Sequence, residues 1–332
     1  MNDMEQLAET LTKEYDIKFK VEYPKLQAAV KEAHPKLSLN TINNYIKNWK
    51  RVESHLKSEF NKIVESGEDW NGAESSFKVI KEFIMAKPLA TRHQYLWSMK
   101  TVSSNILNDK MKSWMDSQIE SGKKELKDYY AEQTKSKRES ENWATLKELQ
   151  KYNKKQRTVA LHTESKTDLR NWLLTSLYVL DVENHPPMRV DYNMEIKHGL
   201  AELDPNKNYL VIINKSKKEF VFGDYKTVKA YGVKRVPLSR KMNSMINIYL
   251  KYHPDNKYLI QDRWGENITK DALQKSIVRA FKGTGKNIGV SMLRHILISE
   301  KVDTGDKLKE KSDVAEKMGH SVATQEIYKK FE

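Results

Sequence analysis

The chain has 332 residues, enough for about two domains, and contains no cysteine. That composition excludes disulfides, thiolate zinc sites and cysteine nucleophiles, and it fits a reducing compartment. Lys and Arg number 59 against 45 Asp and Glu, so the net charge of +14 favours a polyanionic partner, nucleic acid before membrane. No apolar run approaches the ~18 residues of a membrane span, and MNDMEQLAET is not a signal peptide, so we expect an intracellular protein that is not secreted.

Residues 1–133 are predicted to form an all-helical, basic domain. The stretch SLNTINNYIKNWKRVESHLKSEF, residues 38–60, repeats apolar residues at helical spacing along one face, with Ser38 or Asn40 as its N-cap. A second helix ends at Pro88, and a third follows it. The opposite face of the first helix is either a solvated surface or a DNA-binding surface, and its members are Asn43, Asn44, Lys47, Lys50 and Arg51.

The composition changes after TKSKRESENW, residues 134–143, which is predicted to be a linker because it is polar and has no apolar period. Residues 144–332 are predicted to form a second domain. Its expected elements are a helix over 167–182, short strands rich in β-branched and aromatic residues, and helices from Lys241 to the end. The predicted strands cover residues 208–214, 219–225 and 234–239. The expected fold class is mainly α with a small antiparallel β-sheet.

Several motifs that would indicate other chemistry are absent. The glycines of FKGTGKNIG, at positions 283, 285 and 289, match neither the dinucleotide fingerprint nor the P-loop spacing, so this stretch is predicted to be a loop before a helix. The histidines show no HExxH grouping, and no Gly-x-Ser-x-Gly elbow is present. We therefore expect no metal and no cofactor.

Two arginines and a lysine occur in unusual surroundings. Arg189 lies in HPPMRVDY, after an apolar helix, and Arg294 lies among core positions in NIGVSMLRHILIS. Arginine rarely enters such surroundings without an anionic partner. Asp191 is one internal partner for Arg189, whereas Arg294 has no carboxylate within a turn, which favours an external anion. Lys226, in DYKTVKAYGVKRVPLS, is either a solvated lysine or one that a hairpin presents to a ligand.

These segments resemble the motifs of the tyrosine recombinase, or phage integrase, family. The match consists of PPMR, the YKT hairpin, MLRH, MGHS and a tyrosine near the C-terminus, in the family's order along the chain. It covers most of residues 140–332. It is fainter in SLNTINNYIKNW and PLATRHQYLWSMKTV, which look like that family's helical core-binding domain.

The resemblance implies a role for each matching residue. Arg189 and Arg294 would bind the scissile phosphate, and Lys226 would protonate the leaving 5′ oxygen. His320 would bind the phosphate beside them, and Tyr328 would be the nucleophile. Planar guanidinium groups suit the charge that develops on phosphate oxygens, and cationic surroundings favour the phenolate of a tyrosine.

The implied reaction is site-specific DNA recombination or integration through a 3′-phosphotyrosine intermediate, without metal or ATP. The implied partners are double-stranded DNA and further copies of the chain, as a homo-tetramer on two duplexes. The protein would belong to a virus or mobile element and act on DNA in the bacterial or host cytoplasm, or in the nucleus.

The sequence departs from the family pattern in two places. Many members have histidine three residues before the second arginine, where this chain has Ser291, and His320 precedes Tyr328 by eight residues where nine is commoner. His320 is therefore expected in the turn before the tyrosine's helix. His295 lies about 100° around a helix from Arg294, so we expect it to pack or to support the site. The short tail after Tyr328 leaves no long helix for exchange between subunits.

Two alternatives remain open. A type IB topoisomerase shares this active-site plan but only relaxes supercoils, and the helical N-terminal domain favours recombination over it. A DNA-binding protein with a vestigial recombinase site is the other alternative, and Ser291 lends it weight.

Overall fold

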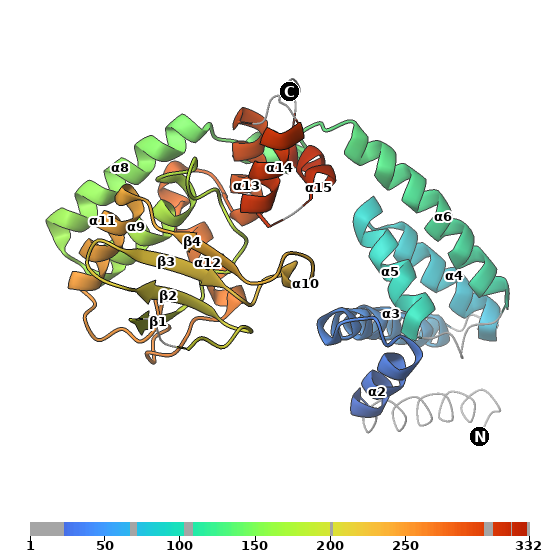
Figure 1. Cartoon of the computed structure of the whole chain (residues 1–332). Helices are drawn as coiled ribbons and strands as arrows, with labels where there is room; N and C mark the ends of the chain where they lie inside the picture. The colour runs from blue at the N-terminus through green and yellow to red at the C-terminus, as the bar shows by residue number, and fades with distance from the viewer. Residues whose placement is uncertain are drawn as a thin grey trace. The chain divides into compact units, whose positions relative to one another are not determined.

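The computed structural model describes residues 23–66, 72–102, 109–199, 202–301, 308–319 and 321–330 (Figure 1). The chain divides into two compact units, Met1–Ala131 and Glu132–Glu332. Within the described ranges, no helix combines the length and the apolar character that crossing a membrane requires.

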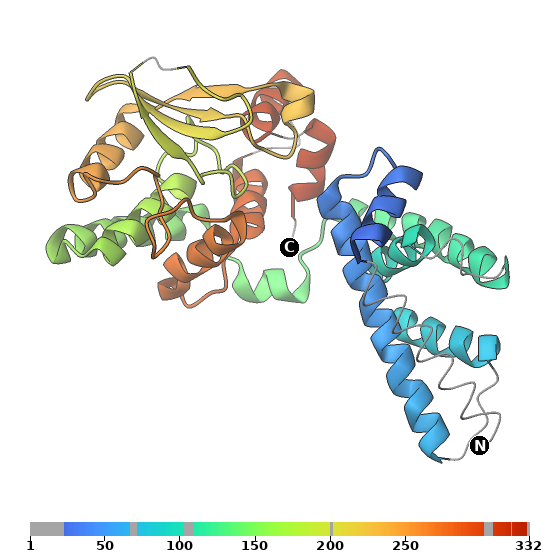
Figure 2. The same cartoon turned by 90° about the horizontal axis from the view of Figure 1, so that it is seen from below.

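The first unit is built from helices that bury one face each. They are α2 (Tyr23–Ala33), α3 (Leu39–Ser66), α4 (Gly72–Met85), α5 (Leu89–Val102) and α6 (Asp109–Ala131). The hydroxyl of Ser38 accepts a hydrogen bond from the amide of Thr41 at 3.1 Å, which confirms Ser38 as the N-cap of α3. Helix α2 lies beside the start of α3, where Val30 packs against Ile42 and Ile46 (Figure 2).

Helix α3 has the predicted division between an apolar and a polar face. Ile42, Ile46, Trp49 and Val52 are buried, and they pack against α2, α4, α5 and α6. The side chains predicted to bind DNA are all exposed: Asn43, Asn44, Lys47, Lys50 and Arg51. The 3.6-residue period of the apolar positions therefore leaves a basic, solvated strip along one helix.

The second unit contains most of the remaining helices and the sheet. Its helices are α7 (Lys137–Asn142), α8 (Leu146–Thr163), α9 (Lys166–Val179), α10 (Val228–Tyr231), α11 (Arg240–Lys251), α12 (Lys270–Ala280), the 3₁₀ turn η1 (Lys282–Thr284), α13 (Val290–Lys301), α14 (Leu308–Lys317) and α15 (Val322–Tyr328). Helix α9 is buried along most of its length and packs against α8, α11 and α12. The prediction of a mainly α fold with a small sheet is confirmed.

The sheet has four strands in the order β1-β2-β3-β4. They are β1 (Glu195–His198), β2 (Asn208–Ile212), β3 (Lys218–Phe222) and β4 (Lys234–Pro237). Leu210, Phe220 and Phe222 join the main core, while Tyr209, Val211 and Val221 form a second apolar cluster. Because side chains alternate across a strand, both faces of β2 and β3 are covered.

The sheet is mixed, which corrects the prediction of an antiparallel one. Strands β2, β3 and β4 pair antiparallel as expected, but β1 pairs parallel with β2, with Glu195 opposite Tyr209. The other edge of β1 is bonded to the chain near Leu259, whose amide donates to the carbonyl of Met194 at 2.9 Å. Strand β1 is therefore held between two stretches of backbone, and its one apolar side chain, Ile196, packs against the main core.

Residues 134–143, predicted as a linker, contain a capped helix. Ser136 and Glu139 form a reciprocal capping box at the start of α7. The amide of Asn287 donates to the side-chain oxygen of Asn142 at 2.6 Å, so the segment contacts the second unit. The division into units falls at Ala131, close to the predicted end of the first domain. The segment is thus a folded part of the second unit and not a structureless connector.

Gly223 allows a close backbone approach at the start of the loop that carries Lys226. A Cβ atom at this position would lie 2.2 Å from the carbonyl oxygen of Pro205 and 2.6 Å from that of Lys207. We expect Gly223→Ala to lower the free energy of unfolding by about 1–3 kcal/mol, because backbone must move to accept the methyl group.

The matched control is Gly289→Ala, whose methyl group would first meet the end of the flexible Gln274 side chain at 3.1 Å. Urea denaturation of both variants measures the difference. Equal stabilities of the two variants would contradict the assignment of a backbone clash at Gly223.

Candidate active site

Tyr328 is the last residue of α15, a helix that follows directly from the end of α14. Ser321 caps α15, with its hydroxyl accepting from the amide of Thr324 at 3.1 Å. Helix α15 packs against α13 and α14, and Tyr328 packs at the edge of the main core. Tyr328 is therefore part of an ordered helix and is only partly exposed to solvent.

Arg294 is buried on α13 and contacts the predicted nucleophile. Its exposed fraction is 1%, and its Nη1 donates to the carbonyl of Pro187 at 2.7 Å and to that of Met318 at 3.2 Å. Its guanidinium carbon lies 5.2 Å from the centre of the Tyr328 ring. Burial lowers the pKa of Arg294, and the neighbouring Tyr328 opposes that shift most strongly.

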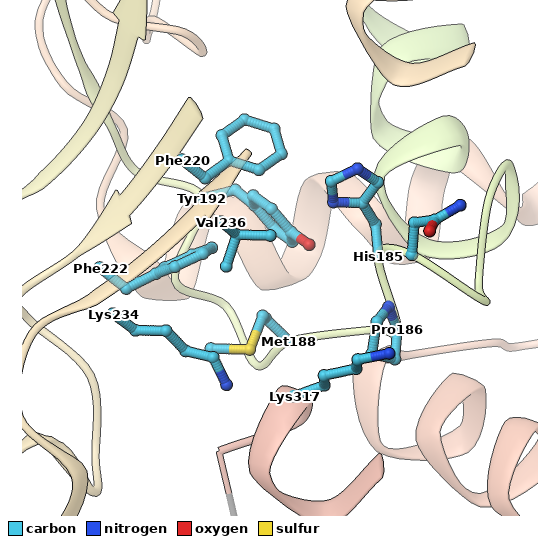
Figure 3. A pocket seen from close by; sticks show the side chains of 10 residues that line it. His185, Pro186, Met188, Tyr192, Phe220, Phe222, Lys234, Val236 and Lys317 are labelled. Carbon is cyan, nitrogen blue, oxygen red and sulfur yellow. The ribbon is translucent and has the colours of Figure 1, made fainter. Parts of the chain in front are cut away.

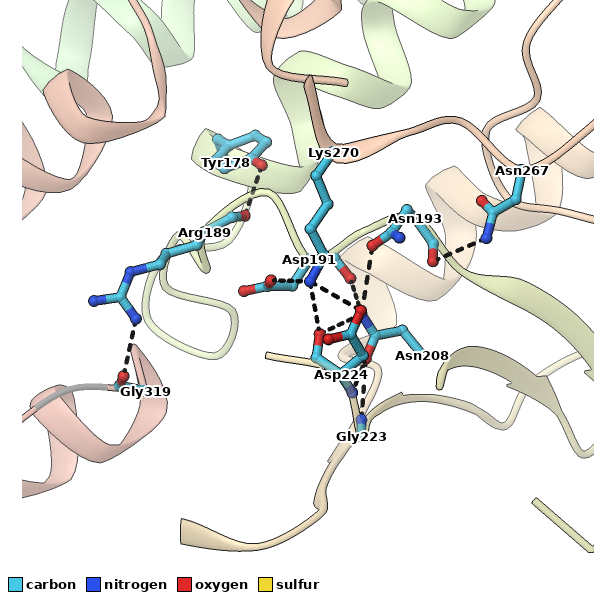
Figure 4. Close-up of polar contacts among 10 residues, drawn as sticks. All are labelled: Tyr178, Arg189, Asp191, Asn193, Asn208, Gly223, Asp224, Asn267, Lys270 and Gly319. Carbon is cyan, nitrogen blue, oxygen red and sulfur yellow. Dashed lines mark hydrogen bonds and ion pairs between the residues drawn. The ribbon is translucent and has the colours of Figure 1, made fainter. Parts of the chain in front are cut away.

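Arg189 reaches the same segment from the loop after α9 (Figure 4). Its Nη1 donates to the carbonyl of Gly319 at 3.4 Å, while its own carbonyl accepts from the Tyr178 hydroxyl at 3.0 Å. Asp191, the alternative internal partner, forms its ion pair with Lys270 at 3.6 Å. The guanidinium of Arg189 thus makes its hydrogen bond with a neutral carbonyl, and the nearby carboxylate is paired with another cation.

Lys226 lies in the connection between the antiparallel strands β3 and β4, as the hairpin prediction requires. Its side chain is exposed, but its two neighbours are fixed. The Thr227 hydroxyl donates to the Gly319 carbonyl at 2.8 Å, and the Tyr225 hydroxyl donates to the carbonyl of Gly232 at 2.7 Å. The backbone that carries Lys226 is therefore attached to the same carbonyl as Arg189.

The common element is the carbonyl pair of Met318 and Gly319 at the C-terminal end of α14. Gly319 has φ +66°, a left-handed conformation that favours glycine after a helix. The last carbonyls of a helix have no partner inside it and carry partial negative charge, so they attract cationic donors. His320, the next residue, lies outside the described part of the chain, and its predicted role stays a prediction.

Sequence reasoning missed the role of this carbonyl pair and that of Thr227. Gly319 in MGHS could have predicted a helix end at this position, because glycine commonly follows the last residue of a helix. Ser291 is exposed in the first turn of α13, whereas His295 packs at a tilt against Tyr328 with ring centres 4.7 Å apart. His295 therefore has the packing contact that its place on the helix predicted.

Gln325 is a buried polar residue one turn before Tyr328. Its exposed fraction is 0%, and neither end of its side-chain amide has a hydrogen-bond partner among the described residues. An unpaired buried amide costs about 1–3 kcal/mol. The packing of α15 against the rest of its unit therefore includes a buried group that lowers the stability of the fold.

A small hollow of about 30 Å³ lies between the sheet and the end of α14 (Figure 3). Phe220, Phe222 and Tyr192 line its apolar side, and Lys234 and Lys317 supply two cations. Lys234 donates to the carbonyl of Glu316, and burial lowers its pKa to about 8. The end of α14 thus accepts hydrogen bonds from a third cationic side chain.

The described residues contain no group of three His, Asp or Glu side chains that could hold a metal ion.

Three buried histidines predict how stability depends on pH. Burial lowers the pKa of His185, His253 and His295 in the folded chain, whereas an unfolded histidine titrates near about 6.5. Below that pH the unfolded state binds more protons, so the free energy of unfolding should fall as pH falls from about 7 towards 5.

Thermal unfolding of the full chain across that pH range measures the effect. His185→Gln should weaken the dependence, because glutamine can still accept from the Ser239 amide, which His185 Nε2 now does at 2.9 Å, but does not titrate. A midpoint that is independent of pH in the native chain would contradict the prediction.

Comparisons with known proteins find similarity among solved structures alone. No protein-family model matches the chain, and no curated protein matches it. Among solved structures, a crystal structure of XerA recombinase is similar at 13% sequence identity, covering 94% of each chain with a TM-score of 0.37. At this identity and TM-score, the similarity assigns neither a fold nor a function to the chain. The chemistry of the site is inferred from the residues of this chain.

Proposed function

We propose that this protein is a DNA strand-breaking and rejoining recombinase that uses Tyr328 as its nucleophile. The observation that carries the proposal is the position of Arg294, which is 1% exposed with its guanidinium carbon 5.2 Å from the Tyr328 ring. Arg189 meets the adjacent carbonyl, and the turn that carries Lys226 is attached to that carbonyl as well. The order of the motifs along the chain and the net charge of +14 support the same reading.

In the proposed reaction, the Tyr328 phenolate attacks the scissile phosphorus and forms a P–O bond to tyrosine. The bond from phosphorus to the 5′ oxygen breaks, and Lys226 gives that oxygen a proton. The products are a 3′-phosphotyrosine and a free 5′ hydroxyl, so attack by a second 5′ hydroxyl reverses the step and joins DNA. Energy is conserved in the phosphodiester, and the reaction consumes no ATP.

The two arginines would stabilise the charge that develops on the non-bridging oxygens. Their hydrogen-bond acceptors from Pro187, Met318 and Gly319 are neutral carbonyls, which orient the guanidinium groups without cancelling their charge. A preorganised positive charge in a partly dry site is worth far more to a transition state than the same charge in water. His320 would add a further phosphate contact.

The first unit would bind duplex DNA through the exposed face of α3. Asn43, Asn44, Lys47, Lys50 and Arg51 are exposed on this face, and side chains of this kind contact phosphates and base edges. The family resemblance further implies four copies of the chain on two duplexes.

Covalent capture on DNA tests the nucleophile. Duplexes with a randomised centre and a nearby nick should trap the protein, because the short cleaved fragment diffuses away and prevents rejoining. The incubation contains excess EDTA, since the proposed chemistry needs no metal. Tyr328→Phe removes one oxygen, so it should abolish the covalent adduct while DNA affinity and folding are retained.

The matched control is Tyr129→Phe, which changes an exposed tyrosine of the first unit and should leave the adduct unchanged. A covalent adduct formed by Tyr328→Phe would show that another residue is the nucleophile. A native chain that binds these duplexes tightly but forms no adduct would favour a DNA-binding protein without catalysis. Relaxation of a supercoiled plasmid, with no joining of two duplexes, would favour a topoisomerase.

The comparison of Arg294 with Ser291 tests the source of charge stabilisation. Arg294→Ala should slow adduct formation on the order of 10²-fold or more, because it removes a preorganised donor. Ser291→Ala should cost no more than roughly tenfold, or about 1.4 kcal/mol, because the exposed hydroxyl can give one hydrogen bond at best. Single-turnover time courses on the captured sequence measure both rates. Equal defects would mean that Ser291 has an essential role.

A further inference from the structure

The final turn of α15 is held by a histidine that the reaction above does not use. The Nδ1 atom of His295 lies 2.8 Å from the carbonyl oxygen of Tyr328, and the two rings pack in a tilted arrangement with an interplanar angle of 33°. A carbonyl oxygen only accepts hydrogen bonds, so Nδ1 must carry the proton. His295 thus contacts both the backbone and the ring of Tyr328.

The far side of His295 faces a carboxylate that is itself fixed. Glu139 Oε1 lies 3.7 Å from His295 Nε2. The other carboxylate oxygen of Glu139 accepts from the amide of Ser136 at 2.9 Å and from its hydroxyl at 2.7 Å, as part of the capping box of α7. The carboxylate therefore has a defined position against the imidazole, set by the first turn of a helix.

The surroundings of His295 act on its charge in opposite directions. Burial lowers the pKa of His295, and Lys330 and Arg294 act in the same direction. The Tyr328 carbonyl and the Glu139 carboxylate oppose that shift. With Nδ1–H facing the Tyr328 carbonyl, a proton on Nε2 would face the Glu139 carboxylate, and contacts at both nitrogens favour one orientation of the ring.

The segment that contains Glu139 makes a second contact with the C-terminal turn of α15. The side-chain amide of Gln133 donates to the carbonyl of Glu326. The Glu326 carbonyl also accepts from the Lys329 amide at 3.2 Å, while the Tyr328 carbonyl faces His295. Residues 133–139 thus contact the final turn of α15 both directly and through His295.

Arg294 and His295 are neighbours on α13, and both contact Tyr328. The guanidinium carbon of Arg294 is 5.2 Å from the Tyr328 ring centre, and the His295 ring centre is 4.7 Å from it. Since consecutive helical residues point about 100° apart, the two side chains approach the phenol from different directions. Arg294 is suited to binding a phosphate beside the phenol, and His295 is suited to holding the phenol in place.

We propose that His295, oriented by Glu139, is a positioning residue that fixes Tyr328 for attack. The proposal rests on the proposed function, and it assigns His295 no contact with DNA. Its effect is on the rate of the chemical step, because a displacement of about 1 Å can cost 10²-fold in such a reaction. Its effect on DNA affinity is small.

Three substitutions at position 295 separate the hydrogen bond from the ring contact. His295→Ala removes both and should slow single-turnover adduct formation roughly tenfold to a hundredfold, with DNA affinity within about twofold. His295→Asn keeps a donor near the position of Nδ1 and should recover most of the rate. His295→Phe keeps a stacked ring without a donor and should stay slow. Glu139→Gln should give an intermediate defect.

Amide hydrogen exchange over residues 322–330 supplies a readout that needs no catalysis. His295→Ala should increase exchange there, and His295→Asn should restore protection, because the proposal concerns how α15 is held. If the native chain forms no covalent adduct, the proposed function fails, and exchange alone decides whether His295 holds α15. If the native chain is active and the Ala variant matches it in rate and exchange, this inference is wrong while the proposed function stands. Recovery by Phe but not Asn would assign the effect to packing and overturn the hydrogen-bond role.

Discussion

The site depends on the unpaired carbonyls at the end of α14. Met318 accepts a hydrogen bond from Arg294, and Gly319 accepts from Arg189 and Thr227. These donors come from a helix, a loop and a strand connection that are far apart in the sequence. A helix end supplies negative partial charge with fixed directions, so it can bring cations together without a carboxylate. The turn at Gly319 then leads directly to His320 and α15.

The carbonyls that accept hydrogen bonds from Arg294 and Arg189 are uncharged, and this affects the net charge of the site. A buried arginine normally has a carboxylate partner, which would cancel its charge. Here Arg294 is held by the carbonyls of Pro187 and Met318, and Asp191 pairs with Lys270. These carbonyl contacts carry no formal charge, so they do not neutralise the guanidinium group. Burial of Arg294 carries a desolvation cost, and a bound phosphate would offset part of that cost.

Much of the fold could be predicted because periodicity reports which face is buried. The apolar face of α3, the cap at Ser38 and the strands β2, β3 and β4 all agree with their predictions. Strand β1 could not be predicted, since EIKH has no apolar alternation and its pairing depends on contacts near Leu259. The helix over 137–142 is short and polar, so only its capping box was readable, at Ser136 and Glu139.

The candidate site divides in the same way. Arg189 and Arg294 stood out as candidates because arginine is unusual in apolar surroundings, whereas Lys226 and Tyr328 became candidates through the resemblance to the recombinase family. The geometry of these side chains could not be predicted from the sequence. It depends on hydrogen bonds to main-chain carbonyls, which every residue possesses. The link from Glu139 through His295 to the end of α15 joins residues distant in sequence, and no local pattern indicates such a pairing.

Gln325 affects how strongly α15, the helix that ends at Tyr328, packs against its unit. A leucine or methionine of similar volume would fill the same buried position without an unpaired amide, and the fold would gain stability. The chain instead keeps the polar residue one turn before Tyr328, in a helix of 7 residues. Active sites often give up stability for function, and the seat of α15 fits that trade-off. The helix that carries Tyr328 is thus less tightly bound to its unit than its burial alone suggests.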